Sequence, residues 1–478
     1  MKLENQSFNK SSFKSSKEII LNDKKIYYDV ISEDNIISDD YGKPLGSIFS
    51  YTYIRTDIEN KEDRPVIFVY NGGPGSSCMW LHLGFFGPRR VKLEDPINPP
   101  TVPPFELEDN PYTLLDICDI VMIDPVECGY GRLIDKDASG EFFTLEKDAL
   151  SIAIFIENWI NKYNRWNSPK YLAGESYGTV RSAVLVNTLM GGPTTGTMKS
   201  VGIPINGIIM LGSCIPVDSS KSNHYYYETS IEDSVLGLPS MAATNWYHND
   251  IKDKALEEFV EEAYDFCADE YLKNLYLGNR MTEDEKNGFI EKLVYYTGLS
   301  KEYLLKNNCR IKLNEFAGEL LRAKGQKVGE YDSRYVLKSS NNIGTPDPVA
   351  DDGAMGTYTP AFMGAMAKYA KEELEIDFNR SYNIINFMVN GLWQEDQFKS
   401  PIEYLRAALR RNKSLKVFIA NGYYDLVTTI GAARYSAANL PKEQVILKEY
   451  ESGHMSYLGE ESVKKLHMDL EEFIISKM

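Results

Sequence analysis

A serine enclosed between two glycines is the first feature of this sequence that could do chemistry. Ser176 stands in the segment Gly174-Glu-Ser-Tyr-Gly178, after a short apolar run and before a helical pattern over Val180–Met190. Small residues at 174 and 178 let a strand and a helix pass closely in a sharp turn, which leaves the serine hydroxyl exposed. The pattern predicts a nucleophile for acyl transfer; a purely structural turn between strand and helix is the alternative.

A serine hydroxyl is a weak nucleophile at neutral pH, so it needs a base and a carboxylate that orients the base. Two late loops supply them. Asp425 ends the segment Asn-Gly-Tyr-Tyr-Asp after one apolar run, and His454 lies in Ser-Gly-His-Met after the next. The order serine, acid, histidine is that of the α/β-hydrolase fold. We therefore predict Ser176 as nucleophile, His454 as base and Asp425 as the residue that orients the histidine.

The other histidines and a second aspartate are weaker candidates for these roles. Asp124 also ends an apolar run, but it precedes the serine and is followed by proline. His82 follows a glycine-rich loop, and His467 lies on the terminal helix. The other two, His224 and His248, fall in a predicted cap. Structural roles are predicted for all of them.

A glycine-rich loop, Asn71-Gly-Gly-Pro-Gly-Ser-Ser77, can supply the other half of an oxyanion hole. Backbone N–H groups approach a substrate oxygen closely only where Cβ atoms are absent. We predict that the N–H groups of Gly73 and Tyr177 form the hole. A phosphate-binding loop is the alternative, but no Lys-Ser or Lys-Thr pair follows the glycines.

The elements that must position these residues form a strand and helix alternation typical of an α/β sheet. Thr144–Tyr163 has a helical apolar stripe, Glu460–Met478 is a terminal helix, and Lys17–Val30 with Pro44–Thr56 is predicted as a leading hairpin. Short apolar runs predict parallel strands buried on both faces. They are Pro65–Tyr70, Asp119–Asp124, Lys170–Ala173 and Ile205–Leu211, and two further strands are predicted over Leu415–Ala420 and Val445–Tyr450.

The length of 478 residues exceeds the ~250–300 residues that one hydrophobic core usually serves. The sequence predicts a flexible N-terminus over 1–16 and an α/β-hydrolase core over 17–217 and 381–478, with a mostly parallel central sheet flanked by helices. Residues 218–380 are charged, rich in Tyr and Glu, and helical in pattern. They predict a large, mainly helical cap insertion.

The formal net charge of −17 makes nucleic acid and anionic membranes poor partners. No run reaches ~18 apolar residues, and no secretory signal is seen at the start, so the chain as written is expected to be cytoplasmic. A secreted form stays open if a leader was removed. Six scattered cysteines are expected to be mostly reduced and structural. No metal or organic cofactor is expected, and a homodimer is left open.

Four motifs occur in one order: NGGPGSS at 71–77, GESYG at 174–178, NGYYD at 421–425 and SGHM at 452–455. Together they resemble the serine carboxypeptidase family, over essentially the whole chain from about residue 20. Phe86-Gly-Pro88 and Asp124-Pro-Val126 extend the resemblance, while Leu238–Ala243 and Trp246-Tyr-His248 are similar to bacterial members.

The resemblance implies an enzyme that removes single residues from peptide C-termini at acidic pH through an acyl-enzyme. It assigns Ser176, Asp425 and His454 to the triad and the N–H groups of Gly73 and Tyr177 to the oxyanion hole. It also implies that the terminal carboxylate of a peptide is bound by three residues, Asn71, Gly72 and Glu175. A protonated Glu175 can donate a hydrogen bond to that carboxylate, whereas an ionised one would repel it.

Three departures from the family pattern leave other functions open. Phe85-Phe86 replaces a second glutamate, Glu127-Cys-Gly129 replaces Gly-Thr-Gly and would place a charge near the substrate cleft, and Gly212-Ser-Cys214 replaces Gly-Asn-Gly. With one carboxyl missing, an esterase or acyltransferase that uses the same triad is the main alternative to a carboxypeptidase. A catalytically silent binding protein that keeps the fold is the third.

Overall fold

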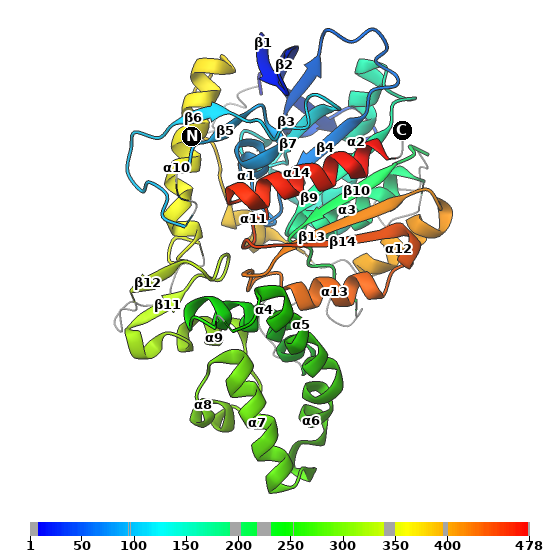
Figure 1. Cartoon of the computed structure of the whole chain (residues 1–478). Coiled ribbons are helices and arrows are strands. Elements are labelled where there is room, and N and C mark those ends of the chain that lie inside the picture. Colours follow the sequence, from blue (N-terminus) through cyan, green and yellow to red (C-terminus); the bar gives the residue numbers. More distant parts are fainter. Residues whose placement is uncertain are drawn as a thin grey trace, which may run out of the picture.

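The computed structural model describes residues 8–476 except 94, 96, 192–201, 218–230, 252, 339–348 and 395–399 (Figure 1). Its strands are β1 Ser12–Leu21, β2 Lys24–Ser38, β3 Pro44–Arg55, β4 Val66–Tyr70, β5 Arg89–Val91, β6 Leu107–Asp109, β7 Asp119–Asp124, β8 Arg132–Leu133, β9 Lys170–Glu175, β10 Gly207–Leu211, β11 Gln326–Val328, β12 Val336–Lys338, β13 Lys416–Gly422 and β14 Val445–Tyr450. Its α-helices are α1 Met79–Leu81, α2 Leu145–Tyr163, α3 Tyr177–Leu189, α4 Ile231–His248, α5 Leu256–Phe266, α6 Leu272–Leu277, α7 Glu283–Thr297, α8 Lys301–Lys306, α9 Leu313–Glu319, α10 Met355–Lys368, α11 Phe387–Leu392, α12 Pro401–Arg411, α13 Ile430–Ala438 and α14 Glu460–Ile475.

One large sheet carries the molecule, in the strand order β1-β2-β3-β7-β4-β9-β10-β13-β14. From β7 to β14 every neighbouring pair is parallel, and all six runs predicted as strands lie in this part. Leu211 at the end of β10 pairs with Glu175 on one side and Ala420 on the other. Because parallel strands end at a common edge, the loops that follow them lie together.

Helices cover both faces of the sheet, which confirms the predicted α/β architecture. Successive side chains of β4 enter two different cores, as the alternation of a strand requires. Ile67 and Val69 belong to a core shared with α10 and α14, whereas Val66, Phe68 and Tyr70 belong to a core shared with α2, α3 and α12. Both sides of the central strands are therefore dry, and their sequences are apolar throughout.

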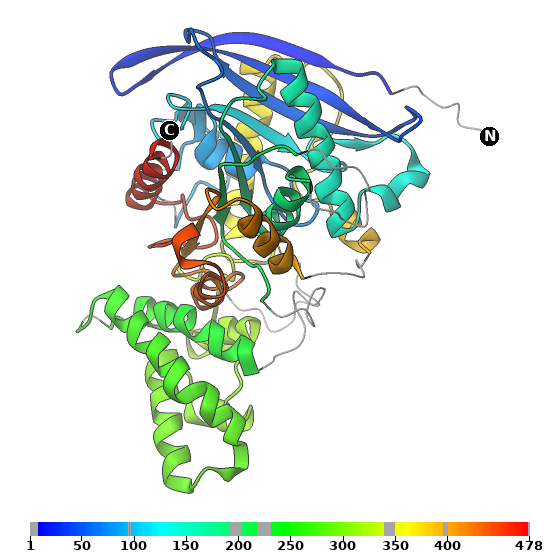
Figure 2. The same ribbon diagram turned by 90° about the vertical axis from the view of Figure 1, so that its right-hand side faces the viewer.

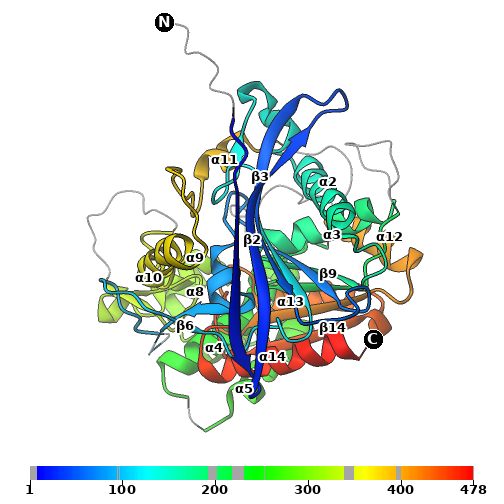
Figure 3. The ribbon, with the colours of Figure 1, turned by 90° about the horizontal axis from the view of Figure 1, so that it is seen from above.

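The predicted leading hairpin is in fact three antiparallel strands. Residues Asn22 and Asp23 both have positive φ values, 50° and 62°, and form a two-residue turn between β1 and β2. The β1 strand begins at Ser12, so it extends five residues into the segment predicted to be flexible. Seen from above, β2 crosses the whole molecule (Figure 3).

A helical unit projects below the sheet in Figures 1 and 2, formed by α4 to α9 together with the short hairpin β11–β12. It has its own apolar core, which includes Met241, Phe266, Phe289 and Phe316. The predicted cap range also contains α10, but this helix packs against α1 and β5 instead, where Tyr358 and its neighbours join the same core as α14. A helical pattern shows that a segment has an apolar face but not which core receives that face.

Candidate active site

The turn between β9 and α3 holds Ser176 in a strained conformation. Its φ of 58° and ψ of −127° are unfavourable for a residue with a side chain. Neighbouring groups fix the turn: the Ser176 N–H donates to Leu211 O at 2.9 Å, and the Thr179 hydroxyl donates to Ser176 O at 2.7 Å. Ser176 is partly exposed, while the residues on either side of it are buried. The turn thus presents the hydroxyl at the carboxyl edge of the sheet.

His454 and Asp425 form a buried pair on the loops after β14 and β13. His454 Nδ1 lies 2.8 Å from Asp425 Oδ2, and Asp425 Oδ1 accepts the N–H groups of Val427 at 2.7 Å and Thr428 at 2.8 Å. The Thr428 hydroxyl donates to Asp425 Oδ2. With its Nδ1 hydrogen directed at the carboxylate, the imidazole keeps Nε2 as the acceptor that a general base needs.

Gly212, the first residue after β10, lies between the histidine and the serine turn. A Cβ at this position would lie 3.1 Å from His454 Cε1, and the residue has a φ of +56°. The preceding carbonyl, Leu211 O, accepts the N–H of Ser176. The imidazole and the serine therefore flank the same turn. Within the described residues Ser176 Oγ has no hydrogen-bond partner; catalytic contacts of this kind often tighten only when substrate binds.

The surroundings of His454 set its protonation. Burial by itself would lower the pKa of the imidazole, but the charge of Asp425 and the hydrogen bond to it outweigh burial and raise the pKa above its ordinary value. Asp425 thus stabilises the imidazolium that forms when the histidine takes a proton.

The glycine-rich loop crosses the N-terminus of α3. A Cβ on Gly72 would lie 2.5 Å from Tyr177 N, so only glycine permits this approach. The next residue, Gly73, is exposed. The structure therefore brings the two residues predicted for the oxyanion hole, Gly73 and Tyr177, to the same end of the helix.

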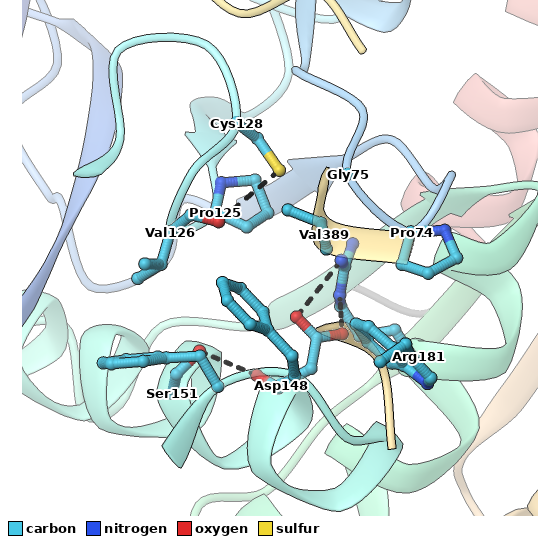
Figure 4. Close-up of a pocket in the computed structure, with 12 residues that line it drawn as sticks. Pro74, Gly75, Pro125, Val126, Cys128, Asp148, Ser151, Arg181 and Val389 are labelled. Carbon is cyan, nitrogen blue, oxygen red and sulfur yellow. Dashed lines mark hydrogen bonds and ion pairs between the residues drawn. The ribbon is translucent and has the colours of Figure 1, made fainter. Parts of the chain in front are cut away.

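A buried ion pair beneath this loop was not predicted from the sequence. Arg181 donates to Asn71 O at 2.6 Å and forms a bidentate pair with Asp148, with distances of 2.6 and 3.2 Å (Figure 4). The Tyr177 hydroxyl also donates to Asp148 at 2.8 Å. Arg181 lies four residues after Tyr177 on one helix face, which is the only sign of this arrangement in the sequence.

Glu175 and Asn71 meet next to the nucleophile. The Asn71 amide donates to Glu175 Oε2, and Asn71 Oδ1 accepts the Leu81 N–H at 3.2 Å. Glu175 is only 3% exposed. Burial raises the pKa of its carboxyl to about 7, against the opposing effects of His454, Tyr457 and Asn71. A carboxyl at this position changes its protonation near neutral pH.

Two departures noted in the sequence have clear places in the structure. Phe85 is fully buried. Glu127 has a φ of 66°, and both oxygens of its carboxylate have partners within the protein. Oε1 accepts the Leu133 N–H at 2.7 Å, and Oε2 lies 3.3 Å from the Asn386 amide. The charge expected near the substrate cleft is therefore engaged in holding this loop.

The competing candidates lie in structural contacts. His82 is buried against the Tyr53 hydroxyl at 2.7 Å, and burial lowers its pKa to about 3. His248 and His467 contact backbone carbonyls at 2.5 and 3.0 Å, and Asp124 accepts the Cys78 N–H at 2.8 Å. His224 lies outside the described residues. None of the six cysteines forms a disulfide, and five of them are buried; the half-buried Cys214 lies 3.8 Å from the Thr179 hydroxyl.

A segment of the predicted cap range, Glu330–Arg334, ties the two catalytic loops together. Glu330 O accepts the Leu426 N–H at 2.9 Å, and Tyr331 O accepts the His454 N–H at 2.6 Å. Arg334 donates to Glu451 O at 3.1 Å and pairs with Asp332 at 2.6 Å. Sequence reasoning did not find this segment, because its contacts are to residues about 100 positions away.

Replacing Asp332 by alanine is expected to destabilise the protein by about 3–5 kcal/mol and to lower kcat, because the nearly buried Arg334 would lose its only carboxylate partner among the described residues. Thermal unfolding and ester hydrolysis measure the two effects. Asp377→Ala removes an exposed ion pair with Lys371 and serves as the control. An Asp332→Ala protein with unchanged unfolding temperature and kcat would show that the segment does not hold the loops.

The fold is that of the α/β hydrolases, and the site has the layout of a serine hydrolase, with a serine in a strained strand-to-helix turn and an imidazole paired to a buried aspartate. The chain belongs to the serine carboxypeptidase family, whose model matches residues 45–465.

Similar proteins of known sequence or structure agree with this membership. Serine carboxypeptidase-like 9 of Arabidopsis thaliana is 26% identical over 229 residues, 46% of this chain and 49% of that protein. Serine carboxypeptidase-like 7 of the same plant is 30% identical over 149 residues, 30% of this chain and 31% of that protein. The chain thus spans about half the length of the first of these relatives and about a third of the second. Kex1(delta)p, a prohormone-processing carboxypeptidase from Saccharomyces cerevisiae, has the same fold, with a TM-score of 0.52 and 15% identity over 96% of this chain and 90% of that one.

Proposed function

We propose that the protein is a serine carboxypeptidase that hydrolyses the C-terminal peptide bond of peptides through an acyl-enzyme. One observation carries the proposal beyond a general serine hydrolase. Glu175, the residue just before the nucleophile, is a buried carboxyl that titrates near neutral pH and is hydrogen-bonded to Asn71. This pair can recognise a carboxylate next to the bond that Ser176 attacks.

The catalytic steps follow from the geometry. Ser176 Oγ attacks the carbonyl carbon of the last peptide bond while His454 Nε2 takes the hydroxyl proton, and the N–H groups of Gly73 and Tyr177 stabilise the oxyanion. The imidazolium then gives that proton to the leaving amine, and the C-terminal amino acid departs. Water repeats the sequence on the acyl-enzyme and releases the shortened peptide. Asp425 keeps the imidazole in the required tautomer throughout.

Substrate recognition depends on the protonation of Glu175. Below its pKa of about 7 the carboxyl is neutral and donates a hydrogen bond to the terminal carboxylate of the peptide, beside the Asn71 amide and the backbone of Gly72. Above this pKa two negative charges would face each other. Peptide hydrolysis therefore requires neutral His454 and protonated Glu175, and ester or amide hydrolysis requires only neutral His454.

Glu175→Gln is expected to remove the fall in peptide kcat/KM that the wild type shows as pH rises through about 7, because glutamine stays neutral at every pH. Release of the C-terminal residue from a blocked dipeptide between pH 4 and 9 measures this. The same peptide with an amidated C-terminus is the control, since its hydrolysis does not involve a terminal carboxylate. An unchanged alkaline limb in the variant would remove Glu175 from carboxylate recognition.

An esterase or acyltransferase is the second candidate function, favoured by the buried Phe85 at the position of a second carboxyl. The assay of the peptide and its amidated twin separates the two candidates. Equal turnover of both by the wild type, or hydrolysis of simple esters without release of amino acids, supports the esterase or acyltransferase and overturns the carboxypeptidase.

Several wider proposals accompany this function. We infer that peptides are the partners of the site and that the helical unit within 218–380 limits their size. A cytoplasmic location, and the poor fit of nucleic acid and membranes as partners, rest on the sequence alone. Within the described part of the chain, none of the helices combines the length and the apolar character that a bilayer span needs.

A further inference from the structure

Two buried polar atoms without hydrogen-bond partners lie beside the nucleophile. Glu175 Oε1 and the Tyr457 hydroxyl are both shielded from solvent, and neither has a hydrogen bond to any other group among the described residues. The two side chains nevertheless lie close enough for Tyr457 to act on the protonation of Glu175. Buried polar groups normally have partners, so an adjacent unpartnered pair indicates a functional contact.

Packing fixes the ring of Tyr457 in this place. The residue lies three positions after His454 and is 2% exposed. A Cβ on Gly84 would lie 2.3 Å from the Tyr457 ring, so the ring fits here only because residue 84 is a glycine. Phe85 stacks on the ring, with centroids 6.3 Å apart and planes at 30°. Phe85 itself has no polar atom that could serve as a hydrogen-bond partner of the Tyr457 hydroxyl.

We propose that Tyr457 is a positioning residue for Glu175, and that its hydroxyl donates to Glu175 Oε1 and leaves the acidic proton on Oε2, next to Asn71 and the substrate carboxylate. The inference rests on the proposed carboxypeptidase function and adds a residue to its recognition site. Burial keeps the Tyr457 hydroxyl protonated through the neutral range. Unlike a second carboxyl, it adds no charge and no titration of its own there.

Other groups face this pair from each neighbouring element. Asp425 and His454 act on Glu175 from the loops after β13 and β14, and Tyr358 acts on Tyr457 from α10. The Asn71 amide approaches Glu175 from the glycine-rich loop. Asn71 and Tyr457 share the carboxyl through different oxygens, Oε2 and Oε1.

Tyr457→Phe tests the inference by removing one buried oxygen. A hydrogen bond to the ionised form of Glu175 is lost, so its pKa should rise and binding of a carboxylate should persist to a pH about 0.5–1 unit higher than in the wild type. Calorimetric titration of an N-acetylated amino acid between pH 5 and 9 measures the midpoint. Tyr335→Phe is the matched control, because its hydroxyl is equally buried and unpartnered, and its midpoint should equal that of the wild type.

The outcomes separate this inference from the proposed function. An unmoved midpoint in Tyr457→Phe, an equal shift in Tyr335→Phe, or no carboxylate binding by the wild type at any pH would overturn the role of Tyr457. If the acetylated amino acid binds with the expected shift but the wild type releases no residue from peptides, the carboxypeptidase proposal fails and the positioning role stands.

Discussion

Ser176→Ala is expected to lower kcat by about 10⁴ to 10⁶-fold on peptides and esters alike. The substitution removes the only atom that can form the acyl-enzyme in the proposed mechanism. The backbone of the turn should persist, because its N–H and C=O are held by Leu211 O and by Thr179. Ester and peptide hydrolysis measure the loss, and a fluorophosphonate probe reports on the nucleophile itself, since wild type should be labelled at Ser176 and the variant should not.

A second serine close by provides the matched control. The hydroxyl of Ser213, two residues after β10, is buried and has no hydrogen-bond partner among the described residues. The Ser213 N–H, which donates to Asn421 at 3.1 Å, is unaffected by a change to alanine. Ser213→Ala should therefore keep its activity and its labelling. Labelling of Ser176→Ala at wild-type rate would show that another residue is the nucleophile, and an unlabelled wild type would favour the silent binding protein.

Asp425→Asn is expected to lower kcat/KM by about 10⁴-fold with the fold intact. The asparagine oxygen can still accept the N–H groups of Val427 and Thr428, which places its NH₂ group against His454 Nδ1. The amide then donates to Nδ1, so the imidazole carries its hydrogen on Nε2 and cannot accept the proton of Ser176. Steady-state kinetics with an ester substrate measures the effect, and circular dichroism verifies the fold.

Asp352→Asn is a suitable control for this change. Asp352 is also a buried carboxylate near the site, but it accepts the backbone N–H groups of Ala354 and Met355 at 2.9 Å and of Glu330 at 2.5 Å and makes no hydrogen bond to the imidazole. A much smaller loss of activity is expected there. If Asp425→Asn kept more than about a tenth of the wild-type activity, its role in fixing the tautomer would be wrong.

Local features of the sequence were sufficient to predict most of the sheet. Runs such as Asp119–Asp124 and Val445–Tyr450 became strands with the predicted bounds. The first of them is buried on both faces, and such strands carry nearly continuous apolar runs. The triad could be predicted from the sequence for a related reason. Parallel strands end at a common edge, so residues that follow β9, β13 and β14 meet whatever their separation along the chain.

Short local patterns were less informative where the backbone turns. The Asn22-Asp23 turn divides what looked like one strand, because two residues with positive φ can reverse the chain within a continuous alternation. The destination of α10 was also undetermined. Its apolar residues predict a buried face but do not identify the core that receives this face, and only tertiary packing decides that.

By itself the sequence determined the order of the catalytic groups along the chain: a nucleophile turn, an acid loop and a histidine loop on a mostly parallel sheet. Tertiary structure decided what holds and tunes these groups. Arg181 reaches Asn71 across 110 positions, Glu330–Arg334 joins the loops of Asp425 and His454, and Tyr457 meets Glu175. Such contacts leave no period or motif in the chain, because they depend on the distances between packed elements and on which polar atoms burial leaves without water.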